Sequence, residues 1–443
     1  MTAHSERARQ WVHIGSGGFA LLLRVLTWPQ AAALAGVALV FNAFVLPRIG
    51  GRRLYRPVDE ARGFPVGIVL YPLGVLLLVL VFPSRPDIVG AAWGVLAFGD
   101  GSATLAGQAI GGLQWPWNRE KTLAGTLAFA VFGAAGAMLL AWWIRPAVTP
   151  PPSLWFVLIA PPAAALAAAL VETIPVRLDD NLSVTITAAA VLWLIDAMTI
   201  DALRAGWPMA RAALPWAIAV NAALAWVARR AHTVSMRGAI MGALVGLVIY
   251  VGGGLAAWTM LVATFAIASA ASRLGLERKV LLGIDEDRGG RRGAGNAIAN
   301  CGVAAVAAIA TIATPYHAPA LLALVAALSA AGSDTVASEI GKAWGRSTFL
   351  ITTFGRVKPG TPGAMSLEGT AAGIVAALAL AALGVELGLI PSSLLLIVVV
   401  SATIGAAVES VLGATLEGPG ILNNDMLNFI NTAVAAAVAL ALT

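Results

Sequence analysis

The carboxylates of this sequence lie in short polar segments between long apolar stretches, and these segments recur in the same order in both halves. The order is an acidic segment, a basic loop, the small-residue start of an apolar stretch, Val-Glu-Ser/Thr, and a cluster of Asp and Asn. In the first half these are Gly99-Asp100-Gly101, a loop before Lys121, Lys121-Thr122-Leu123-Ala124-Gly125-Thr126, Val171-Glu172-Thr173 and Asp179-Asp180-Asn181. In the second half they are Ser333 to Glu339, a loop with Arg356 and Lys358, Ser366-Leu367-Glu368-Gly369-Thr370, Val408-Glu409-Ser410 and Asn423 to Asn428. The shared order predicts an internal repeat.

Acids at these positions need a specific reason, because an ionisable group inside a bilayer costs about 2.5–3.5 kcal/mol on insertion scales. Asp100, Glu172, Asp334, Glu339 and Glu409 all lie in or at the edge of apolar stretches. Each therefore needs a partner, a water-filled cavity or a bound cation. A neutral or arginine-paired acid that holds helices together is the structural alternative, but an ordered, duplicated set of acids favours a ligand.

The neighbours of these acids indicate which ligand to expect. We expect each acidic segment to be a turn, because its glycine or serine residues let the backbone approach a ligand closely. A helix that starts with hydroxyls and small residues, with a cation nearby, forms an anion site suited to phosphate. Carboxylate and amide oxygens suit Mg²⁺, which bridges phosphates. Together these residues predict phosphoryl transfer.

The elements that carry the polar segments are expected to be membrane helices. Of the 443 residues, 59% are hydrophobic and 11% are charged, whereas a soluble domain carries about 25% charged residues. Continuous apolar runs of about 17–25 residues exclude a soluble enzyme, a disordered chain and a porin-type barrel. The net charge of +6 fits basic residues crowded into cytoplasmic loops, so we expect no nucleic-acid partner.

We therefore predict an all-α, polytopic integral membrane protein with about 14 transmembrane helices. Eight predicted helices separate the two acidic segments, and an even number makes the two repeats parallel, with both sites on one membrane face. The basic loops place that face toward the cytoplasm in a multi-pass protein of the cell membrane. The boundary between the repeats divides the chain into residues 1–202 and 203–443.

Both halves resemble known families of lipid kinases. The N-terminal half resembles the dolichol kinase and phytol kinase family at Gly99-Asp100-Gly101, Gly107, Lys121 to Thr126 and Glu172 to Leu182. The C-terminal half resembles the phytyl-phosphate kinase family (DUF92) at Arg291-Arg292, Asn296, Asn300, Ser333 to Glu339, Lys358 to Thr370 and Glu409 to Asn431. The resemblance implies that the first half phosphorylates an isoprenoid alcohol such as phytol or geranylgeraniol. The second half would convert the monophosphate to the diphosphate, with CTP or another nucleoside triphosphate and Mg²⁺.

The resemblance also implies roles for single residues. The catalytic residues would be Asp100, Lys121, Asp334 and Lys358. Contacts with nucleotide and phosphates would come from Thr122, Gly125, Thr126, Asn300, Arg356, Ser366, Gly369 and Thr370. Metal binding would fall to Glu172, Asp179, Asp180, Asn181, Glu339, Glu409, Asn424, Asp425 and Asn428. Because Met365 stands where the first half has Lys121, the positive charge of the second half is expected from Lys358 or Arg356.

Two other functions stay open on the sequence alone. A CTP-dependent lipid-phosphate cytidylyltransferase would use the same metal and phosphate elements. A secondary transporter would also suit two helical repeats with acids inside the membrane. The glycine-rich phosphate loop of soluble kinases is absent, since Gly341-Lys342 is followed by Ala343.

Overall fold

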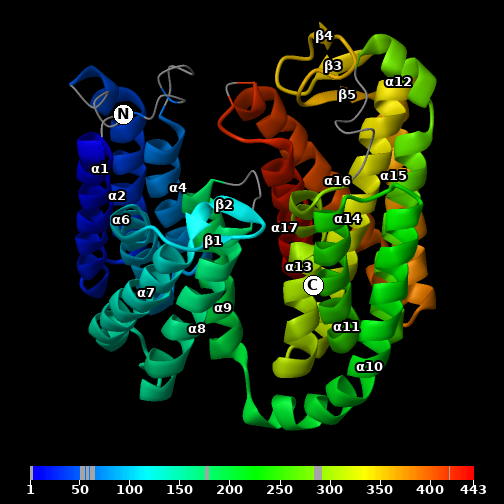
Figure 1. Ribbon diagram of the computed structural model, residues 1–443. Helices are drawn as coiled ribbons and strands as arrows, with labels where there is room; N and C mark the ends of the chain where they lie inside the picture. The colour runs from blue at the N-terminus through cyan, green and yellow to red at the C-terminus, as the bar shows by residue number, and fades with distance from the viewer. Residues whose placement is uncertain are drawn as a thin grey trace. The chain divides into compact units, whose positions relative to one another are not determined.

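The computed structural model describes residues 3–49, 55, 59, 65–174, 179–283, 292–418 and 420–443. The chain folds as two compact units, Met1–Ala197 and Met198–Thr443, called unit 1 and unit 2 below. Both consist mainly of helices (Figure 1). Their division lies a few residues before the predicted one at 202/203, and the assignment of a separate activity to each stays a prediction.

Unit 1 is a helical bundle with one short hairpin. Its α-helices are α1 (Ala3–Ser16), α2 (Trp28–Val40), α4 (Val66–Val81), α5 (Pro86–Gly94), α6 (Gly101–Ile110), α7 (Leu123–Ile144), α8 (Leu154–Thr173) and α9 (Asp180–Ala197). Shorter 3₁₀ and π segments are η1 (Gly17–Arg24), η2 (Phe41–Val45), η3 (Leu46–Arg48), η5 (Val95–Asp100) and η6 (Arg145–Ala147), and the hairpin strands are β1 (Gln114–Trp115) and β2 (Asn118–Thr122).

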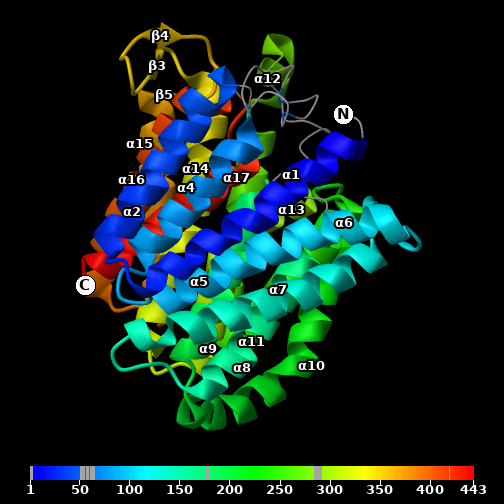
Figure 2. The same ribbon diagram turned by 90° about the vertical axis from the view of Figure 1, so that its left-hand side faces the viewer.

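Small residues allow the helices of unit 1 to pack closely. The helices α5 and α6, joined through η5, run beside α7 (Figure 2). A Cβ atom on Gly94 would lie 2.8 Å from Cα of Ala137, and one on Gly99 would lie 2.7 Å from the ring of Phe129. Close contact of this kind is typical of membrane helices, where packing replaces the hydrophobic effect.

Unit 2 has its own helical core and a small three-stranded sheet. Its α-helices are α10 (Ile200–Arg230), α11 (Met236–Arg273), α12 (Leu276–Leu282), α13 (Ala294–Ala313), α14 (His317–Trp344), α15 (Leu367–Glu386), α16 (Leu395–Leu412) and α17 (Asn424–Ala441). The shorter elements are η8 (Ser392–Leu394), η9 (Gly413–Glu417), β3 (Thr348–Leu350), β4 (Arg356–Val357) and β5 (Ala364–Ser366). The helix α14 is central, since α11, α13, α15, α16 and α17 all pack against it (Figure 1).

The number of membrane spans differs from the prediction. Among the described residues, eleven helices are long and apolar enough to cross a membrane, so the predicted count of about 14 is not confirmed. Residues 236–273 form the single element α11, which is interrupted where Gly254 adopts a φ of 72°. The helix α4 is apolar but has only 16 residues, and α17 carries three asparagines, which lower its hydropathy.

The prediction that the acidic segments are turns is wrong. Asp100 ends the π-helical segment η5 inside one continuous helix from Pro86 to Ile110, and Asp334 lies inside α14. The small residues beside them serve helix packing instead of chain reversal. The Ser333 hydroxyl, for example, donates a 2.8 Å hydrogen bond to the carbonyl of Gly373 on α15. Each acid is thus presented from a helix side.

The two basic loops fold as small antiparallel β-structures that lead into helices. In unit 1, β1 pairs with β2, and in unit 2 the strand order is β4-β3-β5. Each structure ends at the N-cap of the next helix. The Thr122 hydroxyl accepts a bond from the Gly125 amide (3.1 Å), and the Ser366 hydroxyl accepts one from the Gly369 amide (3.0 Å). These caps fix the starts of α7 and α15.

Candidate functional site

Three carboxylates and a lysine meet in unit 1. Oxygens of Asp100 from η5, Glu172 from α8 and Asp180 from α9 lie within 4.8 Å of one another. The Lys121 ammonium on β2 lies 2.5 Å from Glu172 Oε1 and 3.1 Å from Asp180 Oδ2. The fold therefore brings together four residues that the sequence analysis selected from four separate segments.

The electrostatics of this carboxylate cluster favour a cation. Glu172 is 6% exposed, and three carboxylates around one ammonium group would leave an excess of negative charge when all of them are ionised. Burial alone would lower the pKa of Lys121, but the neighbouring carboxylates outweigh it and raise this pKa above its ordinary value. Lys121 therefore stays charged at neutral pH, and a divalent ion would balance the remaining negative charge.

The neighbouring residues Asp179 and Asn181 serve local structure. The Asn181 amide and side-chain nitrogens donate to Asp179 Oδ1 at 3.0 and 2.8 Å, and the side chain also donates to the carbonyl of Gly67 on α4. These bonds shape the start of α9 and tie it to α4. Neither residue belongs to the group of three carboxylates that are close enough to share an ion.

The hairpin of unit 1 is held against the helices by its two tryptophans. The indole of Trp115 donates to the Thr126 hydroxyl (2.9 Å), and that of Trp117 donates to the Thr173 hydroxyl (3.2 Å). Their rings lie 4.7 Å apart. Thr126, a predicted phosphate contact, thus has a protein partner. Gly125 has a packing role, because a Cβ there would lie 2.9 Å from the carbonyl oxygen of Ala103 on α6.

Unit 2 contains a polar cavity of about 320 Å³ between α13, α14, α15, α16, α17 and the β-sheet. Seven of the predicted site residues line it: Asn300, Asp334, Ser366, Thr370, Glu409, Asn424 and Asn428. These residues come from five helices or helix starts, and the fold makes them neighbours. They combine carboxylate, amide and hydroxyl groups in a largely apolar unit.

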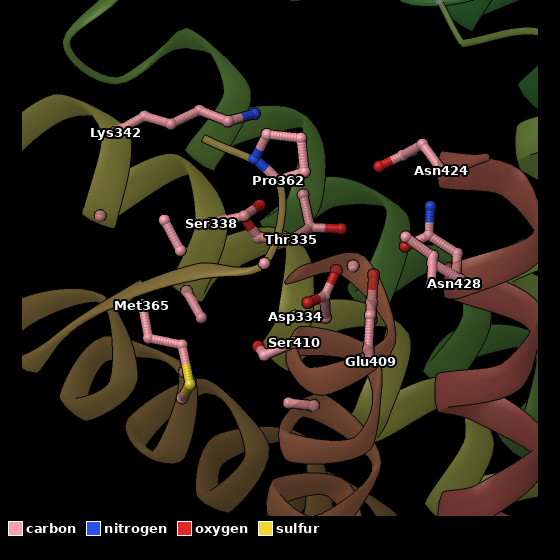
Figure 3. A pocket seen from close by; sticks show the side chains of 18 of the residues that line it. Asp334, Thr335, Ser338, Lys342, Pro362, Met365, Glu409, Ser410, Asn424 and Asn428 are labelled. Carbon is pink, nitrogen blue, oxygen red and sulfur yellow. The ribbon is translucent and has the colours of Figure 1, made fainter. Parts of the chain in front are cut away.

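The acids of this cavity face one another. Figure 3 shows Asp334 on α14 and Glu409 on α16 pointing into the same space, with Asn424 and Asn428 of α17 on the far side. Glu409 Oε2 is buried and meets no hydrogen-bond partner within the part of the chain that the structure describes, although the Glu409 carboxyl group as a whole interacts with Asp334 and Asn431. A buried carboxylate oxygen of this kind is costly unless a ligand satisfies it.

The cations at the cavity differ from those predicted. Arg356 and Lys358 are exposed on the sheet and do not line the cavity, whereas Arg292 and Lys342 do. Lys342 lies on α14, eight residues after Asp334, and the helical period places both on one helix face. This spacing from Asp334 could have identified Lys342 from the sequence. The Lys342 side chain extends along the rim in Figure 3.

Glu339 belongs to an ion-pair network outside the cavity lining. Its carboxylate lies 2.5 Å from Lys279 Nζ on α12 and 2.9 Å from Lys342 Nζ. Lys279 and Glu339 are 1% and 2% exposed. The geometry therefore gives Glu339 a structural role in place of the predicted metal contact. Asp425 does not line the cavity either.

Gly369 serves the packing of α15 on α14. A Cβ at this position would lie 2.5 Å from the carbonyl oxygen of Ala337 and 3.1 Å from Cα of Gly341. No larger residue fits, so the predicted phosphate contact from Gly369 reduces to its backbone amide, which already donates to Ser366.

Several polar residues at the two sites were given no individual role in the sequence analysis. His13 on α1 has its Nε2 atom 3.6 Å from Asp100 Oδ2. The cavity of unit 2 is also lined by Asn296, Thr335, Ser338, Ser410 and Glu417. Ser338 shares the helix face of Asp334 and Lys342, so its four-residue spacing was a usable signal. For His13 the sequence offers none, because its contact spans more than 80 residues.

Comparison with known proteins identifies the family. A family model described as integral membrane protein DUF92 matches residues 219–436. The uncharacterized membrane protein sll0875 of Synechocystis sp. is 41% identical over 200 residues, which cover 44% of this chain and 78% of that protein. The chain belongs to the DUF92 family. It is therefore an integral membrane protein, as its composition predicted.

Two plant proteins are also similar to the chain. Protein VTE6, chloroplastic, of Arabidopsis thaliana is 37% identical over 204 residues, which cover 44% of this chain and 61% of that protein. The probable phytol kinase 2, chloroplastic, of Glycine max is 31% identical over 196 residues, 42% of this chain and 65% of that protein. No solved structure matches the chain.

Proposed function

We propose that the chain is a membrane phosphotransferase for isoprenoid lipids. Unit 1 phosphorylates an isoprenoid alcohol such as phytol or geranylgeraniol, and unit 2 phosphorylates the resulting monophosphate. CTP or another nucleoside triphosphate is the donor. The similarity to a probable phytol kinase supports the substrate class. The observation that carries the proposal is the cavity of unit 2, where acids and cations face one space inside a membrane protein.

The donor set of each site fits Mg²⁺. In unit 2 the ion would be held by Asp334 and Glu409, whose buried Oε2 atom lacks a hydrogen-bond partner among the described residues. In unit 1 it would be held by the cluster of Asp100, Glu172 and Asp180. Bound Mg²⁺ supplies charge neutralisation for the phosphate oxygens of the donor.

The remaining residues of the unit 2 cavity bind and orient the phosphates. Lys342 and Arg292 both line the cavity and bring positive charge to it. Ser366 and Thr370 mark the start of α15, whose first amide groups favour an anion. In the reaction, an oxygen of the lipid phosphate forms a bond to the γ-phosphorus, and the bond from that phosphorus to the bridging oxygen breaks. The nucleoside diphosphate leaves.

The two-unit scheme is tested with purified protein, Mg²⁺, γ-labelled CTP and geranylgeraniol. The wild-type protein is expected to give labelled monophosphate and then diphosphate. Asp100→Asn should stop monophosphate formation, whereas Asp334→Asn should let the monophosphate accumulate. The matched controls are Glu120→Gln beside Lys121 and Glu386→Gln at the end of α15, which are exposed and outside both sites. When geranylgeranyl monophosphate is supplied as the acceptor, Asp100→Asn should still form the diphosphate. Loss of that step in Asp100→Asn, or loss of monophosphate formation from geranylgeraniol in Asp334→Asn, would refute independent sites.

The same reaction separates the proposal from its two alternatives. A cytidylyltransferase would transfer CMP to the lipid phosphate and release pyrophosphate, so γ-label would appear in pyrophosphate. A secondary transporter would consume no nucleotide and would instead move a solute into liposomes with protons or sodium.

A further inference from the structure

A second pocket in unit 2 is lined almost entirely by carbon. It lies between α10, both parts of α11 and α13, and small residues such as Ala225, Gly242 and Ala243 leave its space open. Leu224, Val245, Leu261 and Phe265 supply its larger walls. In a protein that spans a bilayer, such a space suits a hydrocarbon chain.

The polar side chains deep in this apolar pocket are already satisfied. The Asn221 side chain donates to the carbonyl of Ala217 at 2.8 Å and accepts from the Trp258 indole at 3.1 Å. The Thr264 hydroxyl donates to the carbonyl of Met260 at 2.9 Å. These groups therefore need no polar partner from a ligand, and the interior of the pocket presents an apolar surface.

The apolar pocket meets the polar cavity at three residues. Arg292, Asn296 and Asn300 line both spaces. The backbone of Arg292 is fixed to the turn before α11, because its amide donates to the carbonyl of Thr233 and its carbonyl accepts from the Ser235 amide, both at 3.0 Å. The cationic side chain of Arg292 therefore lies at the boundary between the apolar pocket and the polar cavity.

We infer that the apolar pocket holds the part of the isoprenyl chain next to the phosphate, with the lipid phosphate at Arg292 and facing the polar cavity. This inference rests on the proposed function, and it adds the binding site of the acceptor. The start of α13 supports it, because its N-cap is Gly293, which offers no side chain to the first amide groups. An anion at this position would interact with both the N-terminus of α13 and the Arg292 side chain.

The test is equilibrium binding in detergent, without nucleotide, of geranylgeranyl monophosphate and of methyl phosphate. Gly242→Leu fills the pocket, since a Cβ at Gly242 meets no atom within 4 Å and the substitution does not strain the backbone. We expect it to weaken binding of geranylgeranyl monophosphate at least tenfold and to leave binding of methyl phosphate unchanged. The matched control is Leu244→Phe on the same helix, an exposed residue that lines neither space.

Arg292→Met is expected to weaken binding of both ligands, because it removes the charge that both phosphates share. A second filling variant, Ala225→Leu on α10, guards against a local effect of the first and should act in the same direction. Unchanged binding of geranylgeranyl monophosphate in both filling variants, with folding verified by thermal unfolding, would overturn the inference. Binding that depends on the isoprenyl chain, without any transfer of phosphate, would support the inference about the apolar pocket and would refute the kinase proposal.

Discussion

The ion-pair network of Glu339 gives the sharpest test of the assignment of residues in unit 2. Its carboxylate accepts from Lys279 at 2.5 Å and from Lys342 at 2.9 Å. Lys279 is 1% exposed, whereas the Lys342 side chain is 29% exposed and can reach water. Glu339→Gln therefore leaves one lysine buried without a counter-charge.

The structure sets the size and order of the effects. Removing one partner of a buried ion pair costs about 3–5 kcal/mol, so we expect Glu339→Gln to lower the free energy of unfolding by about that amount. Lys279→Met should cost less, about 1–3 kcal/mol, because Glu339 keeps its bond to Lys342. The double variant Lys279→Met/Glu339→Leu should recover part of the loss, because neither buried position then carries an uncompensated charge.

The assay is the unfolding of purified protein in mixed detergent micelles, with and without Mg²⁺. Glu386→Gln, an exposed acid at the end of α15, is the control and should change stability by less than about 0.5 kcal/mol. The reasoning fails if Glu339→Gln is as stable as wild type in the absence of Mg²⁺ but loses the stabilisation that Mg²⁺ provides. That result would return Glu339 to the role of a metal ligand.

Three further predictions use the same protein. Gly369→Val should destabilise the protein by about 1–3 kcal/mol in the unfolding assay, because its Cβ would lie 2.5 Å from the carbonyl oxygen of Ala337; wild-type stability would contradict the packing of α15 on α14. Glu409→Gln should stabilise the Mg²⁺-free protein by about 1–3 kcal/mol and abolish phosphorylation of the monophosphate, because it removes a buried carboxylate that faces the Asp334 carboxylate (Figure 3); a loss of both stability and activity would contradict this. The neighbouring carboxylates raise the pKa of Lys121, so the lysine is charged below its ordinary pKa of about 10.4 and loses its charge only above the raised pKa. The pH profile of alcohol phosphorylation should therefore show no titration of this lysine between pH 6 and about 9. An alkaline step in that profile that disappears in Lys121→Arg would contradict the prediction.

The sequence predicted a helical membrane protein and, in unit 1, four residues that the fold brings together. Long apolar runs fix membrane helices with little ambiguity, because the bilayer sets their length. The carboxylate cluster around Lys121 assembled from the predicted residues. The repeat itself stays a prediction, although Thr122 and Ser366 cap their helices in the same way and Gly125 and Gly369 pack against equivalent carbonyls.

The predictions that failed concerned glycines and charged residues whose roles depend on tertiary structure. Glycine beside Asp100 is consistent with a turn, but here it allows helices to touch. Lys358 is close to the cavity residues in sequence, yet the sheet carries it outward, while Lys342 reaches the cavity from α14. Glu339 is five residues after Asp334 and therefore lies on another side of α14. Its buried partner Lys279 is 60 residues away in the sequence. Such partners are set by tertiary packing, which a local pattern does not contain.

The most direct test of the central claim follows the α- and γ-phosphates of CTP through the reaction. Purified protein is incubated with Mg²⁺, geranylgeranyl monophosphate and CTP labelled either at the α- or at the γ-phosphorus. The account predicts γ-label in the lipid diphosphate and α-label only in the nucleotide. Asp334→Asn should leave the lipid without label from either position, and Glu386→Gln should give the wild-type result. Label from the α-phosphorus in the lipid, or lipid phosphorylation that persists in Asp334→Asn, would contradict it.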